Sequence, residues 1–201
     1  MSENRFSHNQ YQKNIFTEAY EEFCKSIPVE VEENLKQIVA SVSLLGGEHV
    51  LDVGTGTGVL IPYIRKYGSI DIVACDLTQI MLEKAREKHD GVTFWLGDVI
   101  DLPSSLGLFD VVFFNAMFGN VWNQRRILQK ITNRLNPDGR ICISHPLGSH
   151  FVAKLHQDNP RQTPHLLPDQ PRLRFLKEGI PLEVLHYYDE RDFYLLVLKR
   201  L

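Results

Sequence analysis

Three alternating glycines follow a short apolar segment and form the part of this sequence best suited to bind a ligand. The run from 50 to 60 reads VLDVGTGTGVL and contains Gly54, Gly56 and Gly58. Because glycine has no Cβ, a ligand can lie directly against the backbone of such a loop. A helix that begins after the loop would offer free N–H groups to polar or anionic ligand atoms. The spacing therefore predicts a ligand-binding turn between a strand and a helix.

An aspartate ends the next apolar segment. Asp76 comes 18 residues after Gly58, and ligands of open α/β sheets bind outside the carboxyl ends of the strands. A carboxylate there can accept hydrogen bonds from both hydroxyls of a ribose, so the pair of motifs predicts an adenosine-type cofactor. The alternative interpretation of Asp76 is an acidic residue that complements the dipole of the following helix. The alternative for the loop is a tight turn without a ligand.

The spacing of the glycines argues against two common nucleotide-binding loops. A dinucleotide fingerprint G-x-G-x-x-G that starts at Gly54 requires glycine where Val59 stands, and one that starts at Gly56 requires it at Ile61. No Gly-Lys-Ser/Thr follows the loop, so a P-loop is also absent. An NAD-dependent enzyme remains an alternative, weakened by Val59.

Taken together, five segments make the chain resemble the class I S-adenosylmethionine (SAM)-dependent methyltransferases. They stand in the family's order between 50 and 146: VLDVGTGTGVL, VACDLTQIMLEKARE, FWLGDVIDLP, FDVVFFNAMFGNVW and LNPDGRICISHP. One glycine loop would be weak evidence, whereas five ordered segments over about half the chain are strong evidence. The resemblance implies an α/β, Rossmann-like, doubly wound and mostly parallel seven-stranded sheet. It also implies an antiparallel C-terminal strand and N-terminal cover helices.

The resemblance further implies where SAM would be held. The loop Gly54, Thr55, Gly56, Thr57 and Gly58 would pass beneath its methionine portion. The remaining implied contacts are Asp52 at the amino end, Asp76 on the ribose hydroxyls, Leu77 and Met81 beside adenine, Asp98 and Val99 at the adenine edge, Asn115 and Ala116 at the sulfonium end, and Tyr11 or Tyr20 above the cofactor.

Some of these residues have simpler interpretations when they are read alone. Asp98 could be a solvated loop carboxylate, and Asn115 could end a strand through its turn preference. Phe16, Tyr20 and Phe23 stand at helical packing spacing, which favours the core over the ligand.

A base is the one chemical group that methyl transfer from SAM can require of the protein. The transfer is an in-line displacement, and SAM carries its own electrophile. A neutral nucleophile needs a base and an ionised one does not. His145, after the expected strand at 140–144, is the first candidate, and its alternative is a strand terminator. His150, His156 and His165 are weaker candidates. Their spacing is not that of a helical ligand pair, so no metal site is expected.

Short apolar runs that alternate with helical stretches must position these residues, as in α/β proteins. We expect one methyltransferase domain over 1–201. It comprises a helical N-terminal cover (1–46), a SAM-binding core (47–146), an irregular Pro/His-rich insertion or lid (147–181) and a C-terminal β-hairpin (182–201). Within the cover, helical patterning extends over 12–45 with a break at Pro28. In the core, 59–67 is expected to be a helix.

Composition limits the possible functions. The 201 residues are 43% hydrophobic, 23% charged and carry a net charge of −3, which offers no general attraction to nucleic acid or anionic membranes. Three isolated cysteines suggest no disulfide framework and a reducing, cytoplasmic compartment. No signal-peptide core or membrane-length apolar run is seen. We therefore expect a cytoplasmic monomer or homodimer.

These observations predict a SAM-dependent methyltransferase that acts on an O, N, S or C nucleophile of a small molecule and leaves S-adenosylhomocysteine (SAH). No direct binding of nucleic acid or membranes is expected. The alternatives are methylation of a protein or nucleic acid with the help of a partner, and a non-catalytic SAM-binding protein.

Overall fold

A seven-stranded sheet forms the centre of the molecule. The computed structural model describes residues 4–201. The strands are β1 (His49–Val53), β2 (Asp71–Asp76), β3 (Thr93–Leu96), β4 (Phe109–Asn115), β5 (Leu135–His145), β6 (Leu182–Glu190) and β7 (Phe193–Arg200). Their order in the sheet is β3-β2-β1-β4-β5-β7-β6, and β7 runs antiparallel to both of its neighbours. The predicted doubly wound, mostly parallel sheet is confirmed.

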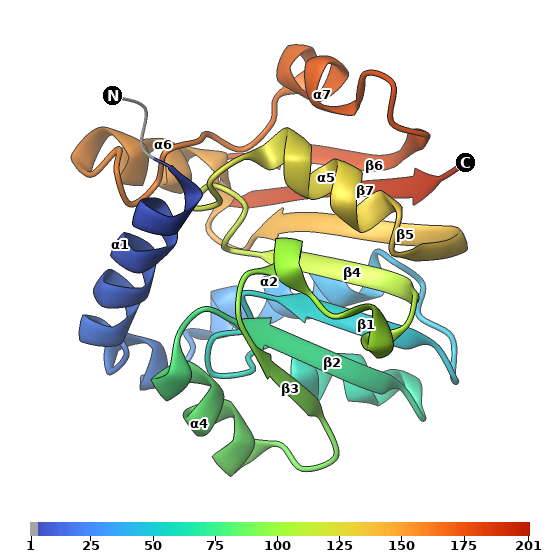
Figure 1. Ribbon diagram of the computed structural model, residues 1–201, viewed down its shortest axis with the longest axis horizontal. Helices are drawn as coiled ribbons and strands as arrows, with labels where there is room; N and C mark the ends of the chain where they lie inside the picture. The colour runs from blue at the N-terminus through green and yellow to red at the C-terminus, as the bar shows by residue number, and fades with distance from the viewer. Residues whose placement is uncertain (1–3) are drawn as a thin grey trace.

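Helices cover both faces of this sheet and one of its edges (Figure 1). The α-helices are α1 (Arg5–Glu18), α2 (Val29–Ala40), α3 (Ile61–Ile64), α4 (Gln79–Lys88), α5 (Gln124–Thr132), α6 (Gly148–Asp158) and α7 (Gln170–Lys177). Short 3₁₀ helices are η1 (Glu22–Cys24), η2 (Arg65–Tyr67), η3 (Val99–Asp101) and η4 (Ser104–Leu106). In Figure 1, α1 lies across the side of the sheet at which β1, β2 and β4 end.

The central strands explain why the sheet is buried on both faces. Side chains alternate between the two faces of a strand, so Leu51 and Phe114 pack in one apolar cluster while Val50 and Phe113 pack in the other. The nearly continuous apolar sequence of β4 is typical of a parallel strand covered on both sides. This packing fixes the carboxyl ends of the strands, from which the polar residues of the site emerge.

The N-terminal cover begins earlier than the sequence pattern suggests. Helix α1 starts at Arg5 and not near residue 12, and the Asn4 side chain caps it by accepting a hydrogen bond from Ser7 N at 2.9 Å. Asparagine is a preferred N-cap residue, so this signal was present in the sequence. Apolar periodicity missed the helix because the side chains that it buries, His8 and Gln12, are polar.

The segment 59–67, which was expected to be one helix, forms only the short α3 and η2.

The segment 147–181 was expected to be irregular, and this expectation is wrong for much of its length. It contains α6 and α7. In α7, Asp169 caps the N-terminus and Pro171 lies in the first turn, where proline is tolerated. Leu173 and Leu176 bury the helix against the core beside α5. The proline content therefore marked helix starts and loops rather than a segment without helices.

No helix in the described part of the chain is long and apolar enough to cross a membrane. Within residues 4–201 there is also no cluster of three or more His, Cys, Asp or Glu side chains arranged to hold a metal ion.

Candidate active site

A cavity lies at the carboxyl ends of β1, β2, β3 and β4, with α1 on its outer side. Many residues that the sequence assigned to the cofactor line it together. They are Gly54, Thr55, Gly56, Thr57, Asp76, Leu77, Met81, Asp98, Val99, Asn115 and Ala116. Asp52, Gly58, Tyr11, Tyr20 and His145 are not among the lining residues.

The glycine loop forms the floor of the cavity. Gly54 N and Thr55 N both donate to Cys75 O, which ties the loop to the end of β2. Gly54 and Gly56 have φ angles of +65° and +54°, which side-chain-bearing residues rarely adopt. A Cβ at Gly54 would lie 2.9 Å from Met117 Cγ, whereas a Cβ at Gly56 would meet nothing within 4 Å. The backbone at Gly56 is therefore open to a ligand.

Asp76 connects the end of β2 to this loop. One carboxylate oxygen accepts a hydrogen bond from Gly56 N at 3.0 Å, and the other accepts one from Thr78 N at 2.8 Å. Burial raises the pKa of Asp76, and these backbone N–H donors oppose the rise. Since a carboxylate oxygen can accept two hydrogen bonds, each oxygen can still receive a ribose hydroxyl.

Asp52 lies below the loop and outside the cavity wall. It is 2% exposed, and one of its carboxylate oxygens accepts a hydrogen bond from Thr55 Oγ1 at 2.6 Å. Burial raises its pKa to about 7, and the nearby Asp76 carboxylate adds to the rise. Asp52 thus supports two residues that line the cavity, Thr55 through a hydrogen bond and Asp76 through its charge. Gly58 is also behind the wall, because a Cβ there would meet the His89 ring.

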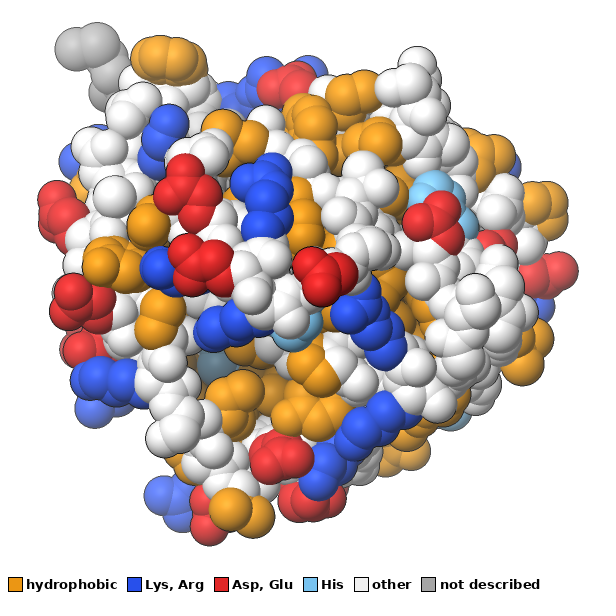
Figure 2. All heavy atoms as spheres, turned by 90° about the horizontal axis from the view of Figure 1, so that it is seen from below, with side chains coloured by type: hydrophobic (Ala, Val, Ile, Leu, Met, Phe, Trp, Pro, Cys, Tyr) orange, Lys and Arg blue, Asp and Glu red, His pale blue; other side chains and the backbone are white. Residues whose placement is uncertain are grey.

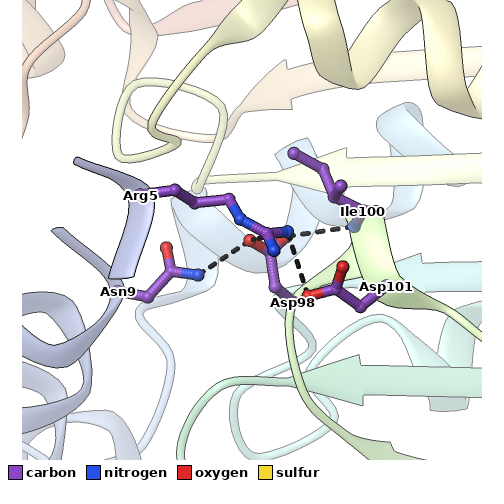
Figure 3. Close-up of polar contacts among 5 residues, drawn as sticks. All are labelled: Arg5, Asn9, Asp98, Ile100 and Asp101. Carbon is purple, nitrogen blue, oxygen red and sulfur yellow. Dashed lines mark hydrogen bonds and ion pairs between the residues drawn. The ribbon is translucent and has the colours of Figure 1, made fainter. Parts of the chain in front are cut away.

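Asp98, after β3, is held by α1 (Figure 3). One carboxylate oxygen accepts from Ile100 N at 3.0 Å, and the other accepts from Asn9 Nδ2 at 2.7 Å. Arg5 Nη1 lies 3.4 Å from Asp98 Oδ2 and 2.9 Å from Asp101 Oδ2. Asp98 therefore anchors the cover helix as well as lining the cavity. The sequence interpretation did not foresee this contact.

Five cavity residues from the N-terminal cover were missed or misplaced. They are His8, Asn9, Gln12, Phe16 and Phe23. The two phenylalanines were expected in the core, yet Phe23 is 46% exposed and its ring packs beside that of Phe16. His8, Gln12 and Phe16 follow one another at four-residue intervals, so they share one face of α1. That spacing was the available signal.

The two tyrosines proposed to cover the cofactor point elsewhere, and this expectation is corrected. The Tyr11 ring stacks under the Arg161 guanidinium, 4.0 Å from its centroid, and Tyr11 Oη contacts Asn159. Tyr20 Oη lies beside Glu21. Tyr11 precedes Gln12 by one position, about 100° around the helix, which turns its side chain away from the cavity.

The geometry also opposes His145 as a base. Its side chain is buried, its Nδ1 accepts a hydrogen bond from Leu147 N at 3.1 Å, and its ring packs against Phe151. Burial lowers the pKa of His145 to about 4. His145 therefore fits the alternative interpretation, a residue that ends β5. His150, His156 and His165 do not line the cavity either.

Comparison with known proteins settles the family. The family model described as "Methyltransferase domain" matches residues 44–179. The chain belongs to this methyltransferase family. Residues 44–179 form a class I SAM-dependent methyltransferase domain, as the resemblance implied, and SAM is the cofactor of this domain. The site fits SAM, because Gly56 leaves open space where a side chain would stand and Asp76 retains free acceptor capacity at the neighbouring strand end.

Two curated methyltransferases are similar in sequence to parts of this chain. The chain is 31% identical over 114 residues to the demethylmenaquinone methyltransferase of Paenarthrobacter aurescens (strain TC1), and the alignment covers 55% of this chain and 44% of that protein. It is 24% identical over 180 residues to the O-methyltransferase resE of Aspergillus sclerotiorum, which covers 84% and 67%. The chain thus spans less than half the length of the first relative.

Solved structures share the fold of the methyltransferase at low sequence identity. The magnesium protoporphyrin IX methyltransferase ChlM from Synechocystis PCC 6803 with bound SAH superposes with a TM-score of 0.71 and 16% identity. That match covers 98% of this chain and 100% of ChlM. A Haloferax volcanii methyltransferase, solved in complex with the Trm112 activator, gives a TM-score of 0.70 at 18% identity and covers 83% and 88%.

Proposed function

We propose that this methyltransferase transfers the methyl group of SAM to a small molecule that binds inside the cavity, beneath α1. The observation that carries the proposal is the attachment of α1 at both flanks of the cavity. Asn9 joins Asp98 on one flank, and Gln12 joins the backbone at 161 and 162 on the other. An acceptor that reacts under this cover must fit within the cavity, which favours a small molecule over a polymer.

The residues of the floor would hold and orient SAM. The glycine loop would lie beneath the methionine portion, Asp76 would accept the ribose hydroxyls, and Leu77 and Met81 would pack beside adenine. Asn115 and Ala116, at the end of β4, would line the sulfonium end. SAM supplies an activated methyl group when it is bound. The protein contributes alignment and exclusion of water, and orientation alone can supply about 7–11 kcal/mol.

Surface charge also supports a small acceptor. Lys and Arg side chains alternate with Asp and Glu side chains on the face that Figure 2 shows, with no extended basic area. The net charge of −3 points the same way, since a basic surface is expected for nucleic-acid binding.

We further infer a reducing, cytoplasmic location from the free cysteines Cys24, Cys75 and Cys142. A monomer or homodimer remains the expected assembly.

Transfer of a labelled methyl group tests the proposal. The protein is incubated with methyl-labelled SAM and, in separate reactions, the small-molecule, protein and RNA fractions of a cell extract, and the products are identified by mass spectrometry. We expect label in a small molecule, and none with Gly56→Val, whose side chain would fill the space reserved for SAM. Label that enters only protein or RNA fractions would contradict the proposal.

A further inference from the structure

Two polar side chains of α1 reach the cavity on the flank opposite Asp98. His8 and Gln12 are 3% and 2% exposed, and both line the cavity. Their hydrogen bonds go to Asn120, in the loop after β4, and to residues 161 and 162, after α6. They therefore lie toward the end of β4 and the insertion, whereas Arg5 and Asn9 lie toward the end of β3.

Gln12 offers a buried acceptor that nothing in the protein satisfies. Its Nε2 donates to Gln162 O at 2.7 Å and to Arg161 O at 3.4 Å. Because both partners are carbonyls, the amide orientation is fixed, and Oε1 is left without a hydrogen-bond partner. A buried acceptor left without a partner carries a free-energy cost. A ligand that brings an O–H or N–H group to Gln12 would remove this cost.

His8 presents a second acceptor one helical turn away. Its ring Nε2 lies 2.8 Å from Asn120 O, so in the neutral imidazole Nε2 carries the proton and Nδ1 has a free lone pair. Within residues 4–201 no group donates a hydrogen bond to Nδ1. Asn120 follows the end of β4 by five residues. The imidazole is thus held by a backbone carbonyl near the strand end that lines the sulfonium side of the proposed cofactor site.

We propose that His8 and Gln12 bind the reacting group of the methyl acceptor, which is a hydroxyl or amine carried by an apolar ring system, and that His8 is its base. This inference rests on the proposed function and names its substrate class. Two neighbouring hydrogen-bond acceptors select a group that donates. The adjoining apolar side chains of Phe16, Val121 and Ile127 favour a ring over a highly polar molecule.

The chemistry balances with the groups present. The acceptor oxygen or nitrogen forms its bond to the methyl carbon as the carbon–sulfur bond breaks, and sulfur keeps that electron pair. The proton of the acceptor passes to Nδ1 of His8. The imidazolium that results keeps its Nε2–H bond to Asn120 O, and a charged donor strengthens this hydrogen bond. When the acceptor is an amine, its second N–H donates to Gln12 Oε1, which orients it and takes no proton.

Two probe acceptors separate this role from a merely structural one. 1-Naphthol must lose a proton during transfer, whereas thiophenol is ionised at neutral pH and needs no base. We expect His8→Gln to lower kcat for 1-naphthol by about 10²-fold or more, the usual contribution of a positioned base, and to leave kcat for thiophenol nearly unchanged. Gln12→Leu should raise KM for 1-naphthylamine, whose second N–H can donate to Gln12 while the first donates to His8, about 3- to 10-fold through the lost hydrogen bond. KM for 1-naphthol, which has one O–H to donate, should stay nearly unchanged.

Matched controls exclude unfolding and loss of the cofactor. His186→Gln and Gln10→Leu change exposed residues of the same types and should leave both reactions intact. All four variants should keep the wild-type affinity for SAH, measured by calorimetry. Equal losses for 1-naphthol and thiophenol would overturn the base role of His8.

The inference and the proposed function fail in different ways. If the wild-type protein transfers methyl to thiophenol or to a compound of the extract, but not to 1-naphthol or 1-naphthylamine, the protic acceptor is wrong and the proposed function stands. If no small molecule receives label at all, both are wrong.

Discussion

The floor and the cover of the cavity are built in different ways. The floor is held by backbone N–H groups of the loop, which donate from Gly54 to Cys75 O and from Gly56 to the Asp76 carboxylate. The cover is held by side chains of α1 whose partners lie 89 to 150 residues away. The floor therefore depends on the loop's backbone conformation and one carboxylate, and the cover on several side chains of α1. This difference suggests that the floor serves the shared cofactor and the cover serves the particular acceptor.

The largest effect should come from filling the floor. Gly56→Val places a β-branched side chain at φ +54° and into open space, so we expect no detectable SAH binding in a calorimetric titration. Gly179→Val is the matched control, because Gly179 has φ +70° and also meets nothing within 4 Å, but it lies away from the cavity. Both variants should lose about 1–2 kcal/mol of stability. Wild-type SAH affinity in Gly56→Val would refute the floor assignment.

A second prediction concerns the buried carboxyl below the floor. The pKa of Asp52 is raised from 3.8 to about 7 in the folded protein, so the folded state keeps its proton longer than the unfolded state does. The stability that this gives is full below about pH 4 and is lost as pH rises through about 7. Asp52→Asn should thus gain stability over the wild type above pH 7, by at most about 4 kcal/mol.

Urea unfolding of the cofactor-free protein at pH 5 and pH 8 measures this difference. The exposed Asp158→Asn serves as the control and should follow the wild type at both pH values. A gain for Asp52→Asn that is the same at pH 5 and pH 8 would count against the buried carboxyl as its source.

The smallest effect should come from loosening the cover. Asn9→Ala removes the 2.7 Å hydrogen bond between α1 and Asp98, which is worth about 0.5–1.5 kcal/mol. We expect SAH to dissociate about 3- to 10-fold faster and the amides of α1 to exchange faster with solvent. Asn14→Ala, at an exposed position of the same helix, should change neither rate. An unchanged rate of SAH dissociation from Asn9→Ala would show that this contact of the cover does not retain the cofactor.

The same contrast explains what the sequence could predict. The glycine loop, Asp76 and the strands beside them follow from local patterns, because a positive φ or an apolar strand leaves its mark in neighbouring residues. The arrangement of these strands in a seven-stranded sheet was implied by the family resemblance. His8 and Gln12 left only a weak mark, a four-residue spacing within a polar segment. Their importance depends on Asn120 and on residues 161 and 162, which the fold brings to them. The resemblance implies an aromatic side chain above the cofactor and so points to Tyr11, and without those partners the sequence does not show that Gln12 faces the cavity instead.

His145 shows the same limit from the opposite side. Its position after β5 correctly indicates that the site lies at the carboxyl ends of the strands. Whether its ring faces the cavity or the protein interior is decided by Leu147 and Phe151, which take up its nitrogen and its face. A position at a strand end therefore locates a residue near a site but does not give the direction of its side chain.

The two aspartates of β2 allow the most direct test of the floor as the SAM site. Asp71 begins the strand, is exposed and lies at the far end from the cavity, whereas Asp76 ends the strand and lines the cavity. SAH is titrated calorimetrically into the wild type, Asp71→Ala and Asp76→Ala, with thermal unfolding as the check on folding. We expect one SAH bound per chain with equal affinity in the first two, and at least about 100-fold weaker binding, or about 2.8 kcal/mol, in Asp76→Ala. Wild-type affinity in a folded Asp76→Ala would contradict the account.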